Sequence, residues 1–246
     1  EQVKRLVRLR ERRHRDREQV FVVEERRILE RALSSGHRPL EIFASPELAG
    51  TLDGLEFKTM SPEALDRASY RKSSTGLIAL FGYFSRSLAD IVFQPGGLYL
   101  VTEGIQKPGN LGALMRICDG AGVAALIVVD SDTDVFNPNA VRASTGAVFT
   151  VPVARASMDE VSSWLSGHGV RSVAADPAAP MSIWESDLTG SMAIWIGAEA
   201  EGLSGTAAGR AEQLVRIPMV GETDSLNASI AAAVMIFESI RQRSDP

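Results

Sequence analysis

Residues 217–238 read IPMVGETDSLNASIAAAVMIFE, and the interpretation of the whole chain starts from this stretch. An apolar strand stops at Pro218, a polar loop follows, and a helix is predicted from Ser225 to about Arg243. Ser225 is a favourable helix N-cap, because its hydroxyl can accept hydrogen bonds from the free backbone N–H groups of the first turn. Since a buried central strand tolerates proline poorly, we expect the strand to end there. Leu226 and Asn227 then emerge into the loop.

Two earlier stretches have the same organisation of an apolar strand followed by a polar loop. Residues 192–196 read MAIWI and continue into GAEAEGLS at 197–204. Residues 98–101 read LYLV and are followed by NLGALMR at 110–116. Strands that are apolar throughout, separated by helical segments, predict a parallel sheet covered on both faces. Gly197 allows close backbone approach at the carboxyl end of its strand, where such folds bind ligands.

The periodicity predicts an α/β protein with two domains. The second half is expected to have strands at 98–101, 125–129, 170–174, 192–196 and 214–217, with helices at 110–121, about 158–166, about 205–212 and 225–243. Asn110 is expected to cap the first of these helices, and Asn137 a short helix at 138–143. The apolar stripe of the helix at 110–121 is expected to be Leu111, Leu114, Met115 and Cys118. The first half is expected to have a charged helix at 1–19, helices at 24–33 and after Ser61, and strands at 21–23, 40–44, 56–59 and 77–81. Residues 84–97 end in the loop-forming sequence QPGG. We therefore predict a domain at 1–84, a linker at 85–97 and a second domain at 98–246.

Composition excludes several classes of protein. The 246 residues include no run of about 18 apolar residues, so no membrane span is predicted. Cys118 is the single cysteine, which excludes an internal disulfide framework. The three histidines are scattered, so no metal site is predicted. No glycine-rich dinucleotide or phosphate-loop motif follows a strand. The N-terminus lacks an apolar signal segment, and a cytoplasmic location is expected.

The three stretches around 110–116, 197–204 and 217–231, in this order, resemble the three motifs of the SpoU/TrmH branch of the SPOUT RNA methyltransferases. The resemblance covers residues 98–246. It implies a parallel-sheet domain with a deep trefoil knot, a homodimer with a shared active site, and S-adenosylmethionine as the methyl donor. It also implies methylation of a ribose 2′-hydroxyl in structured RNA.

The resemblance also assigns roles to residues of the three stretches. Those expected to be catalytic are Arg116, Asn110, Glu199, Ser225 and Asn227. Those expected to bind the cofactor are Gly197, Ile217, Leu226, Met219 and Ala175. The matching arginine of the family is proposed to bind phosphate and to help deprotonate the ribose hydroxyl. Because arginine keeps its proton in almost all settings, a phosphate clamp that orients the hydroxyl is the easier role for Arg116.

The first half resembles the substrate-binding domain that often precedes the SpoU catalytic domain, with Glu25 standing where that domain usually has glycine. Its basic residues suit RNA: residues 1–94 hold 17 Lys and Arg against 14 Asp and Glu, although the whole chain has a net charge of −5. The predicted RNA contacts are Arg116, Arg142, Arg10, Arg13, Arg71 and Lys72. Each could instead lie on an ordinary solvated surface.

The RNA and the class of function have alternatives. A separate N-terminal domain favours ribosomal RNA, 23S rRNA in particular, over transfer RNA, and an antibiotic-resistance methylase of ribosomal RNA would have the same sequence features. A non-catalytic RNA-binding or ribosome-assembly protein would predict decay of Arg116, Asn110 or the two loops, and all of these are intact.

Overall fold

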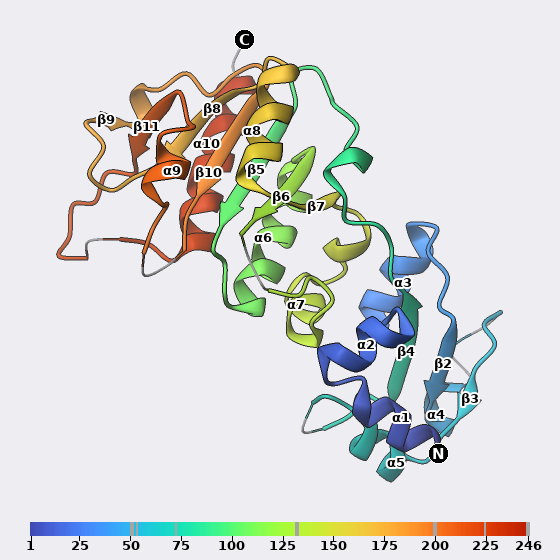
Figure 1. Cartoon of the computed structure of the whole chain (residues 1–246). Helices are drawn as coiled ribbons and strands as arrows, with labels where there is room; N and C mark the ends of the chain where they lie inside the picture. Colours follow the sequence, from blue (N-terminus) through green and yellow to red (C-terminus); the bar gives the residue numbers. More distant parts are fainter. Residues whose placement is uncertain are drawn as a thin grey trace. The chain divides into compact units, whose positions relative to one another are not determined.

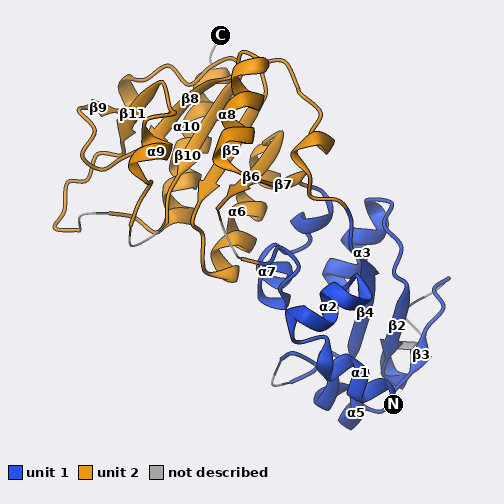
Figure 2. Ribbon diagram, viewed as in Figure 1, with its two compact units in different colours: residues 1–84, 134–150 blue, residues 85–133, 151–246 orange. Residues whose placement is uncertain are grey.

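The chain forms two compact units in the computed structural model, which describes residues 1–49, 52, 54–71, 73–130, 133–198, 201–223 and 225–244. Unit 1 comprises residues 1–84 and 134–150, and unit 2 comprises residues 85–133 and 151–246 (Figure 2). The division differs from the predicted continuous domain at 98–246, because residues 134–150 pack with unit 1.

Unit 1 is built on a small mixed sheet. Within the described residues this sheet has four strands in the order β1-β4-β2-β3, with bounds Val20–Val23, Leu77–Gly82, Glu41–Ala44 and Lys58–Thr59. β4 pairs antiparallel with both β1 and β2, and β3 pairs parallel with β2. The helices from the first 84 residues are α1 Gln2–Arg8, α2 Arg12–Glu18, α3 Arg26–Ser34, α4 Pro46–Ala49 and α5 Pro62–Ala68.

The prediction of one helix over residues 1–19 is wrong, because the chain breaks between α1 and α2. Arg15 is buried, and its guanidinium donates to the carbonyl oxygens of Leu9 and Arg10, both at 2.8 Å. In a continuous helix those carbonyls would accept from backbone N–H groups four residues further on. Leu9 is also fully buried at the break. Burial of the apolar side chain and satisfaction of two carbonyls by one side chain therefore replace a turn of helix.

Aromatic stacking explains why residues 134–150 belong to unit 1. The ring of Phe136 stacks on that of Phe21 in β1, with centroids 4.6 Å apart. The ring of Phe149 meets that of Phe81 in β4 edge-on at 4.8 Å. The segment contains α7 Pro138–Ala143 and the short 3-10 helix η2 Ala147–Phe149. The prediction that Asn137 caps a helix at 138–143 is confirmed, since its side chain accepts from the backbone N–H of Asn139 at 2.9 Å.

Unit 2 is built on a parallel sheet, as the apolar strand runs predicted. Within the described residues it has seven strands in the order β7-β6-β5-β10-β8-β11-β9, and every pairing is parallel. The bounds are β5 Leu98–Glu103, β6 Ala125–Val129, β7 Val153–Ala156, β8 Arg171–Ala175, β9 Met181–Ser182, β10 Met192–Ile196 and β11 Gln213–Arg216. β7 and β9 were not predicted, because short edge strands need no long apolar run.

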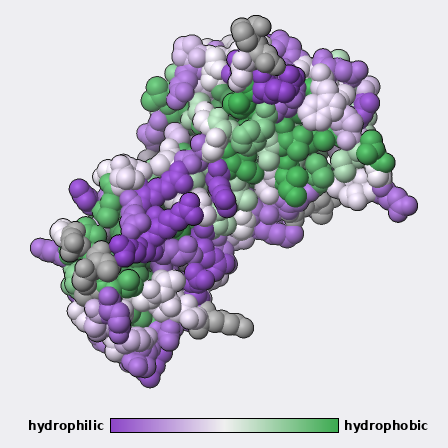
Figure 3. Space-filling model, turned by 180° about the vertical axis from the view of Figure 1, so that it is seen from behind, coloured by the Kyte–Doolittle hydropathy of each residue, from purple (hydrophilic) through white to green (hydrophobic). Residues whose placement is uncertain are grey.

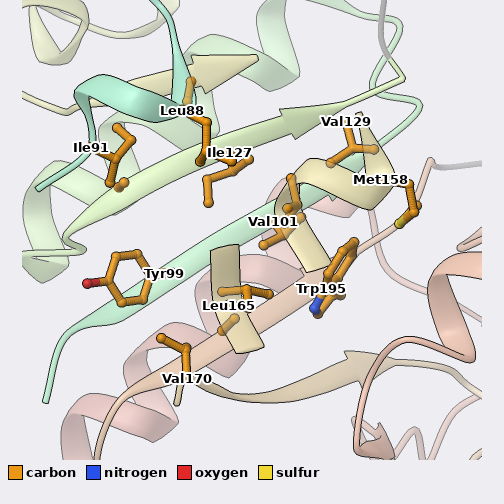
Figure 4. Packing of buried hydrophobic residues seen from close by; sticks show 14 of the residues in the cluster. Leu88, Ile91, Tyr99, Val101, Ile127, Val129, Met158, Leu165, Val170 and Trp195 are labelled. Atoms are coloured by element: carbon orange, nitrogen blue, oxygen red, sulfur yellow. The ribbon is translucent and has the colours of Figure 1, made fainter. Parts of the chain in front are cut away.

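Helices cover both faces of this sheet (Figure 1). α6 Pro108–Ala121 and α10 Ala228–Ser244 pack against each other on one face, and α8 Met158–Gly167 lies over the other. α9 Gly205–Ala208 lies on the α8 side, where Ala207 joins a buried cluster. That cluster joins α8 to residues of β5, β6, β7, β8 and β10, and Figure 4 shows several of them, among them Val101 of β5, Ile127 of β6 and Trp195 of β10. Alternate residues share a face because side chains alternate along a strand.

Residues 85–97, predicted as a linker, pack as part of unit 2. Leu88, in the 3-10 helix η1 Leu88–Asp90, and Ile91 both join the buried cluster. The Tyr99 hydroxyl accepts from the backbone N–H of Gln94 at 2.9 Å. The apolar side chains of Leu88 and Ile91 therefore anchor residues 85–97 to the sheet.

A further 3-10 helix of unit 2, η3 Ile183–Glu185, follows β9.

Candidate active site

A cavity of about 350 Å³ opens in unit 2 at the carboxyl ends of three neighbouring strands, β10, β8 and β11. Several residues predicted for the cofactor or for catalysis line it, namely Ala175, Gly197, Ile217, Met219, Ser225 and Leu226. Ala175 ends β8, Gly197 follows β10, and the other four come from the loop between β11 and α10. The cavity has the size of a small-molecule site and lies at the edge where parallel sheets bind ligands.

The loop after β10 folds back tightly on itself beside the cavity. Ala198 and Gly202 exchange backbone hydrogen bonds at 3.1 and 2.9 Å. A Cβ atom built on Gly197 would collide with the backbone of Gly202 and Leu203. Glycine is therefore required at 197, because the backbone of Gly202 and Leu203 lies where a side chain would stand. The predicted catalytic residue Glu199 lies outside the described residues.

The loop before α10 holds the opposite wall of the cavity, and its cap differs from the prediction. α10 begins at Ala228, so Ser225 is not its N-cap. Asn227 takes this role, because its side-chain oxygen accepts from the backbone N–H of Ser229 at 2.9 Å and from the Ser229 hydroxyl at 2.6 Å. An asparagine oxygen reaches N–H groups two residues on as readily as a serine hydroxyl does. Ser225 is consequently left exposed at the cavity.

α6 carries the remaining two predicted catalytic residues. The helix begins at Pro108, which stands in its first turn, so Asn110 lies inside the helix instead of capping it as predicted. The predicted apolar stripe is confirmed: Leu111, Leu114, Met115 and Cys118 are fully buried. Burial raises the pKa of the Cys118 thiol, which agrees with an inert core cysteine.

Arg116 is exposed on α6. Among the described residues of the chain, those that line the cavity do not include Arg116, Asn110 or Asn227. The predicted cofactor-binding residues therefore all line the cavity, whereas three of the predicted catalytic residues do not. α6 nevertheless packs directly against α10, the helix that follows the cavity loop.

The predicted RNA contacts of unit 1 fall into different environments. Arg10 donates to the backbone carbonyls of Arg67 and Ser69, so it closes the end of α5. Arg71 pairs with Glu25 at 2.8 Å. Arg13 pairs with Glu11 at 2.7 Å on the surface. Arg142 is exposed on α7, and Lys72 lies outside the described residues. In the view of Figure 3, hydrophilic residues form one broad patch on part of the surface.

Sequence reasoning did not single out Asp176, Leu203 or Ala231, which also line the cavity. Asp176 directly follows β8, so its position after an apolar strand was a usable signal. Among the described residues, no group of three or more His, Cys, Asp or Glu side chains is arranged to hold a metal ion. A search of the same residues finds no helix with the length and apolar character needed to cross a membrane.

Comparison with known families agrees with this geometry. Residues 97–237, which contain the cavity loops and α6, match the SpoU rRNA Methylase family. The chain belongs to the SpoU rRNA methylase family. Residues 1–79 match the MRM3-like substrate binding domain, which supports the resemblance noted for the first half of this SpoU protein.

Individual relatives extend over most of the SpoU chain. The 23S rRNA (guanosine-2′-O-)-methyltransferase RlmB of Vibrio cholerae is 36% identical over 196 residues, which cover 77% of this chain and 79% of that protein. A crystal structure of an RNA 2′-O ribose methyltransferase superposes with a TM-score of 0.88 at 38% identity, covering 98% and 96% of the two chains. The SpoU methyltransferase AviRb from Streptomyces viridochromogenes, solved with AdoMet, has a TM-score of 0.90 at 25% identity, covering 99% and 98%.

Proposed function

We propose that this protein transfers a methyl group from S-adenosylmethionine to a ribose 2′-hydroxyl of ribosomal RNA, with 23S rRNA as the substrate. The observation that carries the proposal is the cavity formed by Gly197, Ile217 and Leu226, within the segment that matches the SpoU family. The 23S rRNA activity of the RlmB relative and the AdoMet bound to AviRb support the same reaction.

The residues present fit the methyl donor. Ile217, Met219 and Leu226 offer apolar surface to an adenine ring, and the backbone around Gly197 offers N–H and C=O groups that can read its edge. Glycine at 197 lets the backbone of Gly202 and Leu203 approach closely beside the cavity. Ala175 and Ser225 complete the wall, the first with a small side chain and the second with a hydroxyl.

S-adenosylmethionine, when bound, supplies an electrophilic methyl group on a positively charged sulfur. The residues of the chain would hold the RNA and present the ribose 2′-hydroxyl to that methyl group, with the hydroxyl proton passing to solvent water. Arg116 keeps its positive charge, so its part is to bind an RNA phosphate and stabilise negative charge developing on the 2′-oxygen. Asn110, Glu199, Ser225 and Asn227 are proposed to orient RNA or cofactor.

The protein is proposed to act as a homodimer with a shared active site. The family resemblance implies this arrangement, and α10 supports it by leaving Ile230 and Phe237 half-exposed, at 52% and 51%. A second subunit would also bring further groups to a cavity that Arg116 does not line in the single chain. The trefoil knot remains a prediction from the family resemblance. A cytoplasmic location remains a prediction from the sequence.

Calorimetric titration with S-adenosylmethionine tests the cofactor site. Wild type should bind, Leu226→Trp should lose binding by filling the cavity, and Val220→Trp should bind normally. Val220 is the matched control because it belongs to the same loop, is fully exposed and does not line the cavity. Equal binding by all three proteins, or no binding by wild type, would refute the assignment.

Mapping of 2′-O-methylation on ribosomal RNA tests the reaction. Cells without the gene should lack one methylation that the wild-type gene restores and that Arg116→Ala does not restore. Arg116→Ala should still bind S-adenosylmethionine, because Arg116 lies outside the cavity. A restored methylation in the Arg116→Ala strain would remove Arg116 from the mechanism, and an unchanged methylation pattern without the gene would favour a non-catalytic RNA-binding protein.

A further inference from the structure

Within unit 1, folding brings the loop after α5 against α7, which is far away in sequence. The Tyr70 hydroxyl accepts a hydrogen bond from the side-chain amide of Asn139 at 3.0 Å. The amide oxygen of Asn139 accepts from the Arg142 guanidinium at 3.1 Å. One asparagine thus fixes an aromatic ring and a cation beside each other, and both are exposed to solvent.

Hydrogen bonds fix Tyr70 both at its backbone and at its hydroxyl. Its backbone N–H donates to the Glu24 carboxylate, while its hydroxyl is fixed by Asn139. The residue as a whole still has 37% of its surface exposed. Tyr70 is partly exposed although two polar groups fix its position, so its ring is prepared for a flat partner, because little side-chain entropy remains to be lost on binding.

The neighbouring surface is a small cleft that Tyr70 lines together with four apolar residues, two glutamates and two arginines. Val22, Ile28, Pro138 and Val141 provide apolar surface, and Glu24 and Glu25 provide carboxylates. Arg71 is paired with Glu25 at 2.8 Å, which neutralises part of this acidity. Glu24 and Glu25 would repel a phosphate, whereas Arg142, which lines the same cleft and is exposed, would attract one. The charge pattern therefore favours a base at Tyr70 and a phosphate at Arg142.

We propose that Tyr70, Asn139 and Arg142 form a binding site for one unpaired nucleotide of the RNA substrate. The base stacks on the Tyr70 ring, and the Arg142 guanidinium contacts the adjacent phosphate. Proteins recognise single-stranded RNA by stacking exposed bases on aromatic rings, whereas bases inside a duplex cannot be reached in this way. The inference rests on the proposed function for the identity of the RNA, but the site itself lies entirely in unit 1.

Fluorescence anisotropy of the full chain with a labelled single-stranded oligoribonucleotide and with a duplex of the same length tests the site. Tyr70→Ala should weaken single-strand binding about tenfold, since base stacking on an aromatic ring contributes on this scale. It should leave duplex binding unchanged. Tyr70→Phe keeps the ring and should bind within about threefold of wild type. Equal effects of Tyr70→Ala on both RNAs, or no effect on either, would overturn the proposal.

The salt dependence separates the phosphate contact from general charge. Arg142→Ala should reduce the slope of log affinity against log salt for the single strand by about 0.7. Arg27→Ala removes an equal charge from an exposed position of unit 1 and serves as the matched control. The Arg27→Ala protein should keep the wild-type preference for single strand over duplex. A slope change that is the same in both variants contradicts a specific phosphate contact at Arg142.

A measurement on the wild-type protein guards against misfolded variants. Photocrosslinking to an oligoribonucleotide containing 4-thiouridine, followed by peptide mapping, should label Tyr70 or the peptide containing α7. Labelling confined to other peptides would count against the site. If wild type methylates ribosomal RNA but the Tyr70 variants bind normally, only this inference fails. If wild type binds single strands through Tyr70 but does not bind S-adenosylmethionine, only the proposed function fails.

Discussion

Glu103, at the end of β5, holds Ser204 by two hydrogen bonds: the Ser204 hydroxyl and backbone N–H each donate to one carboxylate oxygen at 2.7 Å. Ser204 in turn caps α9, accepting from the backbone N–H of Ala207 at 3.1 Å. Residues 201–203, which directly precede Ser204 and line the cavity, are therefore held at a fixed point beside the sheet.

Glu103→Ala should raise the dissociation constant for S-adenosylmethionine about tenfold, because two charge-assisted hydrogen bonds that order the wall are lost. Glu103→Gln keeps one acceptor oxygen and should have a smaller effect. Glu160→Ala is a matched control: Glu160 holds Ser157 through the same two kinds of bond, each at 2.7 Å, at the start of α8. Calorimetry should show that Glu160→Ala retains affinity. Equal losses of affinity in both alanine variants would contradict the positioning role of Glu103.

Gly197→Ala should abolish or strongly weaken binding of S-adenosylmethionine. The added methyl group would collide with the backbone of Gly202, so the loop would have to move. Gly205→Ala adds the same methyl group eight positions on, where no heavy atom lies within 4 Å, and should bind normally. Thermal unfolding of both variants, recorded with the titrations, shows whether the change is local. Wild-type affinity in Gly197→Ala would mean that the tight return of the chain is not needed.

Arg15→Ala should destabilise the protein by about 3–5 kcal/mol, the usual result of breaking a buried ion pair. Arg15 has 1% of its side chain exposed and pairs with Asp134 at 2.5 Å, besides satisfying two carbonyls. Arg13→Ala breaks an exposed pair with Glu11 and should cost at most about 1 kcal/mol. Urea unfolding measures both values. A small loss in Arg15→Ala would show that Asp134 and the carbonyls find other partners.

The stability of α10 should depend on pH through Glu238. The Arg241 guanidinium, hydrogen-bonded to Glu238, holds the pKa of that buried carboxyl below its usual value. A carboxylate with a lowered pKa stabilises the folded state above its unfolded pKa of about 4.3, and this contribution is lost as the pH falls below that value. Wild type should therefore be more stable than Glu238→Gln at pH 7, with the difference shrinking towards pH 3. A difference that stays constant over this range in urea unfolding would exclude the ion pair as its cause.

The order of strands and helices in unit 2 was readable from the sequence because buried parallel strands are apolar throughout. The runs at 98–101, 125–129 and 192–196 each became a strand. The edge strands β7 and β9 were not predicted, because they are short and contain polar residues. The caps were misplaced at both Asn110 and Ser225, since several neighbouring residues can each satisfy a helix end and only packing selects one.

The sequence by itself determined the parallel sheet, the small residues at the carboxyl ends of its strands, and the loops that carry the family motifs, because these follow from local polarity and backbone freedom. Only the tertiary structure decided that residues 134–150 join unit 1, that Asn139 links Tyr70 to Arg142, and that Glu103 holds Ser204. The Asn139–Tyr70 and Glu103–Ser204 contacts, and the packing of residues 134–150, join residues distant in the chain. No local pattern encodes such pairings, since they depend on which surfaces the whole fold brings together.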